Sequence, residues 1–380
     1  MKILLIASPN PYGRGGEVRS YEVLRRLQNF GIHTNLLTDL NNVSVLNKLS
    51  DYIDCIYKAK CFKNHELCIT LMIKKAMDLR NNDFDLIVSH SEHPRYSLSA
   101  YSIAKLLRRP WTAIINSYIY IDPYTYKKSL TRFIRNTFAI HCLNKTLVHL
   151  VSYAIQDELQ KRGFGFKYYE VLETPVGIDW EIIDHVRKEF KKEEKEYDLA
   201  FMGVLSAEKG IYDIAYIVYK LKKKLGKSIK VVLIGKFTSF TEEAKYLSLL
   251  NKLQIQNNVK IKGYLSGEVK YRELLKAKLF VFPSRVDVFP ISILEALALG
   301  LPVVTLDLPY SREFKTNAVI KARSIDELVN IINALLSDDE LREMLSTMGR
   351  RYAMNYTWEK ATLSEYKAYL KTVEWLNEVK

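Results

Sequence analysis

Short runs of β-branched and apolar residues alternate with longer helical patterns along this chain, and the alternation occurs in two series. The first series begins with KILLIAS at 2–8, and the second begins with YDLAFMG at 197–203. Strands that alternate with helices predict βαβ units, in which the strands form a parallel sheet. Because 380 residues exceed what one hydrophobic core usually organises, we expect two doubly wound α/β domains separated by a cleft.

The expected strands and helices locate the domain junction. In the first series the strand patterns lie at 2–8, 33–39, 85–90 and 111–116, and a helical pattern lies at 17–29. In the second series the strand patterns lie at 197–203, 230–235, 259–264, 278–284 and 302–307, and the helical patterns at 210–225, 241–253 and 290–299. The segment 180–197 is rich in charge and has no apolar strand pattern. We therefore divide the chain into domains at 1–185 and 186–356.

Composition indicates a soluble globular protein. Apolar residues make up 48% of the chain and charged residues 26%, and no stretch approaches the ~20 apolar residues that span a bilayer. The first eight residues are too short for a signal peptide and are typical of a strand. The four cysteines (Cys55, Cys61, Cys68, Cys142) include no CxxC pair and no histidine at zinc spacing. These features predict neither a metal site nor a disulfide framework, and they predict a reduced, cytoplasmic location.

The loop PNPYGRGGEVRS at 9–20 follows the first strand. Glycines such as Gly15 and Gly16 let the backbone approach a ligand closely, and the start of the next helix offers free N–H groups to an anion. The loop does not match G-x-G-x-x-G, because Val18 occupies the third glycine position. It is predicted to hold a phosphate or a sugar hydroxyl; the alternative is a turn that only connects a strand to a helix.

The segment GVLSAEKG at 203–210 occupies the equivalent place in the second series. A lysine after a strand and before a helix can direct its ammonium group at a diphosphate, and Glu208 is expected to orient Lys209. The alternative is an exposed lysine at a helix start.

The segment PSRVDVFPISILEALALGLPVV at 283–304 is the most informative. Pro290 suits a first helical turn and Gly300 suits the position after the last turn, so a helix is predicted at 290–299. Glu295 then lies within this helix and Asp287 in the loop before it. Two carboxylates so placed can accept hydrogen bonds from hydroxyl groups of a sugar and of a ribose. The alternative for Glu295 is a structural salt bridge. The N–H groups of the first turn, at Ile291 and Ser292, can bind a phosphate.

In the same order, these segments resemble the landmarks of the family-4 group of retaining GT-B glycosyltransferases. The resemblance rests on the Gly-Gly loop, the EKG segment, the acidic residue before Glu295, LEALALGLPVV, and TWEKATLSEYKAYL at 357–370, and it covers nearly the whole chain. It implies a GT-B architecture of two Rossmann-like domains. The N-terminal domain would bind the acceptor, 186–356 would bind the donor, and 357–380 would cross back onto the N-terminal domain.

The resemblance also implies roles for single residues. By similarity, Asp287 takes the place of the first glutamate of the E-x7-E motif and is expected to be catalytic, and Glu295 matches the ribose-binding second glutamate. Lys209 matches the lysine that contacts the donor diphosphate. The other expected donor-binding residues are Gly15, Gly16, Ile291 and Ser292.

A histidine is expected beside the transferred sugar, after the strand that ends near Ser89. His90 and His93 both follow that strand, and His90, at the better distance from Asp85, is the predicted catalytic residue. Two positions depart from the family pattern. Val204 replaces the usual arginine of the diphosphate clamp, and Asn116 replaces a histidine at the end of a later strand.

The predicted activity is transfer of a sugar, with retention, from a nucleotide-sugar donor to a glycan or a lipid-linked acceptor, without a metal or another cofactor. One alternative is a nucleotide-sugar epimerase or a sugar phosphorylase of the same fold. Another is a non-catalytic protein that binds nucleic acid or a membrane, because the net charge is +14. Nucleic acid is not expected as a partner of the glycosyltransferase.

Residues 117–145 mix aromatic residues with Lys127, Lys128, Arg132, Arg135 and Lys145. At helical spacing, Leu130, Phe133, Ile134 and Phe138 can share one face flanked by basic residues, a pattern typical of a helix at an anionic membrane surface. The hypothesis is peripheral contact with the inner face of the membrane. The alternative is that these apolar residues belong to the core.

Overall fold

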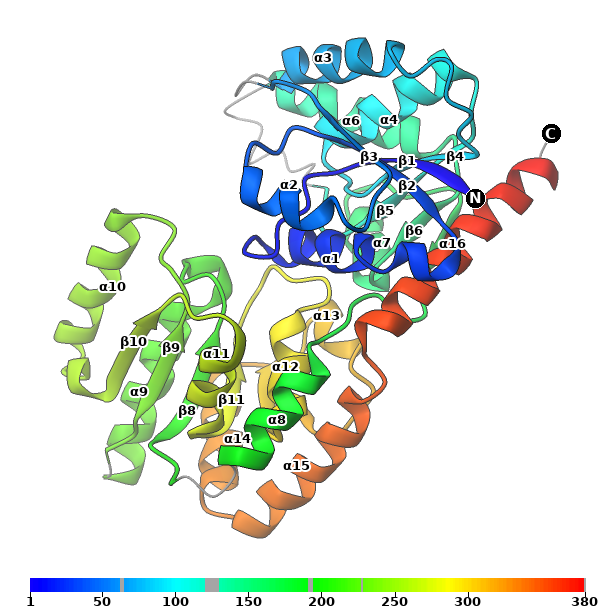
Figure 1. Cartoon of the computed structure of the whole chain (residues 1–380). Coiled ribbons are helices and arrows are strands. Elements are labelled where there is room, and N and C mark those ends of the chain that lie inside the picture. The colour runs from blue at the N-terminus through cyan, green and yellow to red at the C-terminus, as the bar shows by residue number, and fades with distance from the viewer. Residues whose placement is uncertain (62–64, 120–129, 191–193, 227, 379–380) are drawn as a thin grey trace. The chain divides into compact units, whose positions relative to one another are not determined.

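The computed structural model describes residues 1–61, 65–119, 130–190, 194–226 and 228–378. The chain divides into two compact units (Figure 1). Unit 1 consists of Met1–Gly177 and Trp358–Lys380, and unit 2 consists of Ile178–Thr357. The expected boundary at 185/186 falls inside helix α8 (Trp180–Phe190), so the junction precedes this helix.

Unit 1 contains a parallel sheet of seven strands in the order β3-β2-β1-β4-β5-β6-β7. The strands are β1 (Lys2–Ile6), β2 (His33–Thr38), β3 (Cys55–Lys58), β4 (Leu86–Ser89), β5 (Trp111–Ile115), β6 (Val148–Leu150) and β7 (Tyr169–Val171). The helices are α1 (Gly15–Leu24), η1 (Leu27–Phe30), α2 (Val43–Leu49), α3 (His65–Met77), α4 (Pro94–Leu107), α6 (Leu130–Leu143), α7 (Tyr153–Gln160) and α16 (Trp358–Glu378). The strand order reverses direction between β1 and β4.

Unit 2 contains a parallel sheet of six strands in the order β10-β9-β8-β11-β12-β13. The strands are β8 (Tyr197–Met202), β9 (Val231–Ile234), β10 (Val259–Gly263), β11 (Ala277–Phe282), β12 (Val303–Leu306) and β13 (Val319–Ala322). After α8, the helices are η2 (Ala207–Lys209), α9 (Ile211–Leu225), α10 (Phe240–Lys252), η3 (Gln256–Asn258), α11 (Gly267–Leu275), α12 (Ile291–Leu299), α13 (Pro309–Arg312), α14 (Ile325–Leu336) and α15 (Asp339–Ala353). Here the order reverses between β8 and β11.

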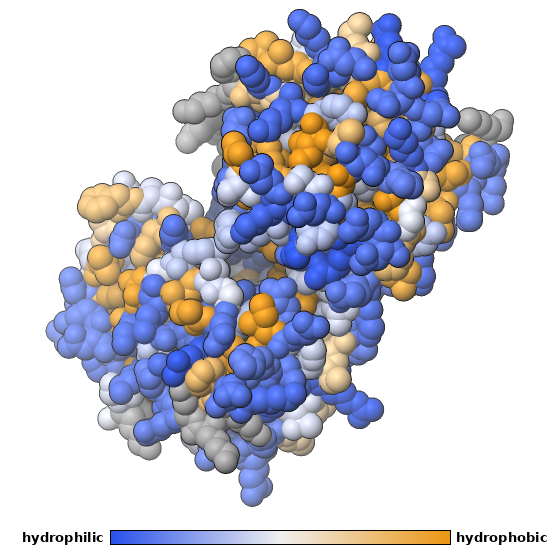
Figure 2. Space-filling model, in the orientation of Figure 1, coloured by the Kyte–Doolittle hydropathy of each residue, from blue (hydrophilic) through white to orange (hydrophobic). Residues whose placement is uncertain are grey.

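The central strands of each sheet form the cores. Every residue of β4, β5, β9 and β12 is buried, as expected for parallel strands covered by helices on both faces. Figure 2 shows hydrophilic residues over much of the visible surface of each unit, with hydrophobic residues scattered among them. Among the helices that the structure describes, none is long and apolar enough to cross a membrane.

Helix α16 belongs to unit 1 although it follows unit 2 in the sequence. At its start, the guanidinium Nε of Arg26 lies 2.9 Å from a carboxylate oxygen of Glu359. Further along, the hydroxyl oxygen of Thr372 lies 2.8 Å from Nε2 of the buried His149. Ala361, Glu365 and Tyr369 of α16 are fully buried, so the helix contributes to the core of unit 1.

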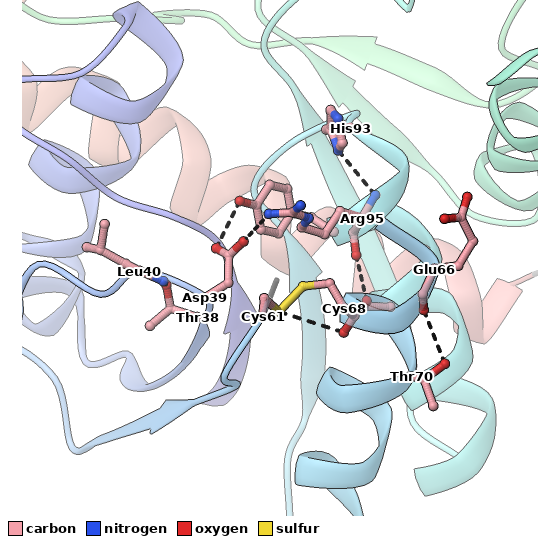
Figure 3. The surroundings of a disulfide bond; sticks show 11 residues. Thr38, Asp39, Leu40, Cys61, Glu66, Cys68, Thr70, His93 and Arg95 are labelled. Carbon is pink, nitrogen blue, oxygen red and sulfur yellow. Dashed lines mark hydrogen bonds and ion pairs between the residues drawn. A yellow bond between two sulfur atoms is a disulfide. The ribbon is translucent and has the colours of Figure 1, made fainter. Parts of the chain in front are cut away.

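The expectation of no disulfide is wrong, because Cys61 and Cys68 form one (Figure 3). Cys61 follows β3 and Cys68 lies in α3, and their Cα atoms are 4.8 Å apart, a distance suited to a disulfide. A separation of seven residues gave no motif from which the pairing could be predicted. Among the described residues, Cys55 and Cys142 are free thiols. The argument for a reduced location from the cysteine pattern therefore loses its basis.

Candidate functional site

In unit 2 the loops that follow β8 and β11 lie on either side of the reversal in strand order. Open α/β sheets bind their ligands beyond the carboxyl ends of the strands at this point. The two loops approach closely: a Cβ atom on Gly210 would lie 2.5 Å from the carbonyl oxygen of Pro283. Gly210 also has a φ of +82°, which glycine adopts without strain. Glycine at this position therefore lets the loop that carries Lys209 pack on the loop that carries Asp287.

Lys209 and Asp287 form an ion pair within these loops. The Nζ atom of Lys209 lies 2.7 Å from Oδ1 of Asp287 and 3.3 Å from the carbonyl oxygen of Val286. The two side chains are 23% and 15% exposed, so the pair is partly shielded from water but open to a ligand. We expected Glu208 to orient the lysine; in the structure Asp287 does so instead.

Helix α12 ends at Leu299, as the sequence predicted, and begins one residue later than predicted, at Ile291. Pro290 is extended and forms no side-chain hydrogen bond to the first turn, which begins at Ile291 and Ser292. Gly300 ends the helix with a φ of +84°. A helix N-terminus without a side-chain cap directs its backbone N–H groups outward, and these groups and the helix dipole favour an anion.

Glu295 of α12 is ion-paired with helix α11. Its Oε1 atom accepts hydrogen bonds from Nζ of Lys270 at 2.7 Å and from the hydroxyl of Tyr271 at 2.8 Å. Lys270 and Tyr271 could not be predicted from the sequence, because the contact joins two helices and no local motif contains it. The salt bridge that was the alternative role for Glu295 is therefore present. It brings a further cation, Lys270, next to the predicted donor residues.

The position of Val204 adds no charge to unit 2. Its side chain is 37% exposed at the end of β8, where the family pattern has an arginine. Arg285 lies in the loop after β11, but both terminal nitrogens of its guanidinium group contact the carboxylate of Asp213. Arg285 is therefore already engaged by a carboxylate.

In unit 1 the glycine loop leads into α1 at Gly15. A Cβ atom on Gly16 would lie 3.2 Å from Cβ of Asn116, so the start of α1 packs closely against the residue that follows β5. The side-chain amide of Asn116 donates to the carbonyl oxygen of His90 at 2.9 Å. Glu92 lies in no motif that the sequence showed, and its carboxylate accepts hydrogen bonds from the Asn116 N–H at 3.0 Å and the Ser117 hydroxyl at 2.6 Å. Burial raises the pKa of Glu92, while these hydrogen bonds oppose the rise.

The structure places His90 in the interior of unit 1. Its Nδ1 atom lies 2.7 Å from the hydroxyl of Ser20, and its Nε2 atom lies 2.5 Å from Oε1 of Glu365. Arg19 is 2.6 Å from the other oxygen of Glu365, and the His90 and Glu365 side chains are 0% exposed. Because protein groups engage both ring nitrogens, a structural role fits His90 better than the predicted contact with a sugar. His93 instead forms the N-cap of α4, where its Nδ1 accepts from the Arg95 N–H at 3.2 Å.

Comparison with known proteins identifies the class of enzyme. Residues 183–352 match the family model described as Glycosyl transferases group 1. Sulfoquinovosyl transferase SQD2 of Arabidopsis thaliana is 24% identical over 95% of this chain and 72% of its own length. O-antigen chain mannosyltransferase B of Escherichia coli is 22% identical over 69% of this chain and 70% of its own length. The chain is a glycosyltransferase, and its residues 183–352 carry the group 1 domain.

Solved structures show the fold of this glycosyltransferase. Anabaena Alr3699/HepE in complex with UDP and glucose has a TM-score of 0.75 and 17% identity, covering 98% of this chain and 100% of that one. The predicted GT-B architecture of two Rossmann-like domains is thereby confirmed. The UDP-GlcNAc 2-epimerase of Neisseria meningitidis, with a TM-score of 0.61 and 14% identity, covers 98% of this chain and 100% of that one. Fold alone therefore does not separate a glycosyltransferase from the epimerase alternative, whereas the family match and the named relatives do.

Among the described residues of the glycosyltransferase, one group has the side chains of a metal site. Asp39, Cys61 and Cys68 place their ligand atoms within 4.8 Å of one another (Figure 3). The two sulfur atoms form the disulfide, and the carboxylate of Asp39 contacts Arg95 at 2.5 Å and the hydroxyl of Tyr96 at 3.0 Å. In this state the group is a disulfide beside an ion pair, with no thiolate to bind a metal.

Proposed function

We propose that the glycosyltransferase takes a nucleoside diphosphate sugar into unit 2 and transfers the sugar with retention. The ion pair between Lys209 and Asp287, beside the N-terminus of α12, is the observation that carries this proposal. The family match at 183–352 contains all of these residues. The complex of the Anabaena protein with UDP and glucose supports the class of donor.

Each group in unit 2 is assigned one task on the donor. Lys209 and the N–H groups of Ile291 and Ser292 bind the diphosphate, and they stabilise the charge that develops as it leaves. Asp287 orients the Lys209 ammonium and accepts a hydrogen bond from a hydroxyl of the transferred sugar. Glu295 accepts a hydrogen bond from a ribose hydroxyl. The sugar acquires oxocarbenium character while its bond to the diphosphate breaks.

Calorimetry with a panel of nucleotide sugars tests the donor site. We expect one of them to bind, and we expect Lys209→Met to weaken that binding by about 10-fold to 100-fold, because a charge-assisted hydrogen bond is lost. Lys220→Met is the control, since Lys220 pairs with Asp326 on an exposed surface. Folded wild-type protein that binds no nucleotide sugar would refute the proposal.

Retention has a separate test. An α-linked donor is incubated with the enzyme in the absence of an acceptor, and proton NMR follows the sugar that water releases. The α anomer should appear first and then equilibrate. Initial release of the β anomer would contradict retention, but it would not contradict the proposed donor site.

For the acceptor we propose a lipid-linked substrate bound by unit 1 at a membrane surface. Ile134 and Phe138 of α6 are 58% and 53% exposed, so the expectation that they belong to the core is wrong for these two. They lie four residues apart on one helix face, while Ala139 and Cys142 face the core. Lys127 and Lys128 lie outside the described residues, as do the side chains of Leu130 and Arg132. Processive diacylglycerol alpha-glucosyltransferase of Acholeplasma laidlawii, 23% identical over 71% of this chain and 82% of its own length, is a relative whose name includes a lipid acceptor.

Sedimentation with vesicles tests membrane contact. Anionic vesicles should carry the protein into the pellet at low salt, and high salt should release it. The double variant Ile134→Ser/Phe138→Ser should stay in the supernatant. Phe240→Ser is the matched control, because Phe240 is an equally apolar residue that is 85% exposed in unit 2. Equal sedimentation of the double variant and the wild type would exclude this face of α6.

A further inference from the structure

Lysines hold the two carboxylates of the predicted motif in unit 2. Lys209 pairs with Asp287, and Lys270 pairs with Glu295, each at 2.7 Å. The first lysine belongs to the family pattern, but the second lies on α11 in no recognised motif. Its Nζ atom also lies 4.3 Å from the centre of the Tyr271 ring, which is buried. The ammonium of Lys270 is thus fixed by a carboxylate and by an aromatic ring.

The geometry of α12 locates this ammonium relative to the helix N-terminus. Glu295 follows Ile291 by four residues and Ser292 by three, so all three lie on one side of the helix. Side chains of an α-helix lean toward its N-terminus, and the carboxylate of Glu295 therefore lies over the first turn. Because Lys270 reaches that carboxylate, its ammonium lies beside the first turn, where the proposed phosphate site is.

The charges around the first turn of α12 favour the binding of an anion. A helix N-terminus repels a cation, so the position of Lys270 depends on a negative partner. Glu295 provides one negative charge, through Oε1. The side chains of Lys270 and Glu295 are 18% and 10% exposed, which weakens the screening of their charges by water. A diphosphate bound at the first turn would add negative charge where the lysine and the helix both favour it.

We propose that Lys270 is the second cation of the donor diphosphate site and replaces the arginine that is missing at Val204. This inference rests on the proposed function of unit 2. When the donor binds, the ammonium is shared between Oε1 of Glu295 and a phosphate oxygen, and Oε2 of Glu295 is the oxygen assigned to the ribose. Arg285 does not take this role, because its two terminal nitrogens contact Asp213.

Calorimetry on the full chain tests Lys270 with two kinds of probe. The ribonucleoside diphosphates UDP, GDP, ADP and CDP report on the whole site, and inorganic pyrophosphate reports on the phosphate contacts without a ribose. Lys270→Met should weaken the binding of the tightest diphosphate and of pyrophosphate by about 10-fold or more, since each loses a charge-assisted hydrogen bond. Lys270→Arg should restore most of this binding.

Control variants separate the possible causes. Lys278→Met also removes a partly exposed lysine from an ion pair, here with Asp198 at 2.9 Å, but at the amino end of β11, and should bind both probes like the wild type. Glu295→Gln should weaken the nucleoside diphosphate more than pyrophosphate. Circular dichroism confirms that each variant is folded, and Lys270→Gln replaces Lys270→Met if the methionine variant is not.

Three outcomes would overturn the inference. If Lys270→Met weakens the nucleoside diphosphate but not pyrophosphate, Lys270 acts only by positioning Glu295 for the ribose. If Lys270→Met binds both probes like the wild type, Lys270 has no role in binding and the proposed function stands without it. If the wild type binds none of the four diphosphates, the proposed function fails and this inference fails with it.

Discussion

Two clusters of charged residues in this enzyme lie at the same place in their sheets and differ in exposure. In unit 1, Arg19, His90 and Glu365 gather near the reversal of strand order, with side chains at most 1% exposed. In unit 2, Lys209 and Asp287 lie at the corresponding reversal with side chains that are 23% and 15% exposed. Position in the fold therefore does not by itself make a binding site. The buried cluster pairs its charges within the protein, whereas the partly exposed pair remains accessible to a ligand.

The largest expected effect is the loss of Glu365 from the buried cluster. Burial alone would raise the pKa of Glu365, but the charges of His90 and Arg19 and hydrogen bonds hold it well below its usual range. Glu365→Ala leaves Arg19 buried without its counter-charge and should lower the free energy of unfolding by about 3–5 kcal/mol, measured by urea titration. Glu359→Ala, at a side chain that is 69% exposed, is the control and should cost less than about 1 kcal/mol. Similar losses of unfolding free energy in Glu365→Ala and Glu359→Ala would show that buried and exposed ion pairs do not differ in this protein.

A pH titration sharpens the comparison within unit 1. Burial lowers the pKa of His149 from 6.5 to about 4, so the folded protein holds this histidine neutral. Between these two values the unfolded chain binds the extra proton and the folded chain does not. The free energy of unfolding therefore keeps its full value above pH 6.5, and this one group lowers it by about 3 kcal/mol as the pH drops to 4. Urea unfolding of the wild type and of His149→Gln should show a smaller pH dependence in the variant, and equal slopes would contradict the role of His149.

In unit 2 we expect effects on the ligand. Glu295→Ala should lose about 1–3 kcal/mol of donor affinity, because a ribose hydroxyl loses its acceptor in a partly shielded site. Calorimetry with the donor measures the loss. Glu340→Ala, at an exposed residue of α15, is the control. Unchanged affinity in Glu295→Ala would return Glu295 to a purely structural role.

The smallest expected effect is the loss of protein stability when the partly exposed pair of unit 2 is broken. Asp287→Asn should change the free energy of unfolding by less than about 1 kcal/mol, since the pair is partly solvated and breaking it strands no buried charge. Thermal and urea unfolding of the variant without ligand give the value. A loss as large as that of Glu365→Ala would mean that the pair in unit 2 is structural as well.

Local patterns carried most of what the sequence predicted correctly. Alternating strand and helix patterns predicted two parallel sheets, and Pro290 and Gly300 predicted the ends of α12, because each signal acts within a few residues. Lys209 and Asp287 were placed correctly on loops that follow neighbouring strands. For these features, the chemistry of the segment decides the structure.

Contacts between distant segments could not be predicted. His90 is buried because Glu365 reaches it from 275 residues away, and no local pattern records that partner. Lys270 meets Glu295 only through the packing of α11 on α12, and the disulfide joins a residue after β3 to a residue within α3. Strands β6 and β7, with three residues each, are too short for a periodic pattern to show.

The return of the chain to unit 1 through α16 has a consequence for the order of synthesis. Residues 1–177 emerge from the ribosome first, but Arg19 lacks its counter-charge, and His90 its carboxylate partner, until Glu365 has been made. Unit 2 is one continuous segment, from Ile178 to Thr357, and ion pairs such as Lys209–Asp287 and Lys270–Glu295 join residues of that segment alone. The half of the enzyme that is translated first is therefore the half that is completed last, and a nascent chain stalled before α16 would carry a finished unit 2 beside an unfinished unit 1.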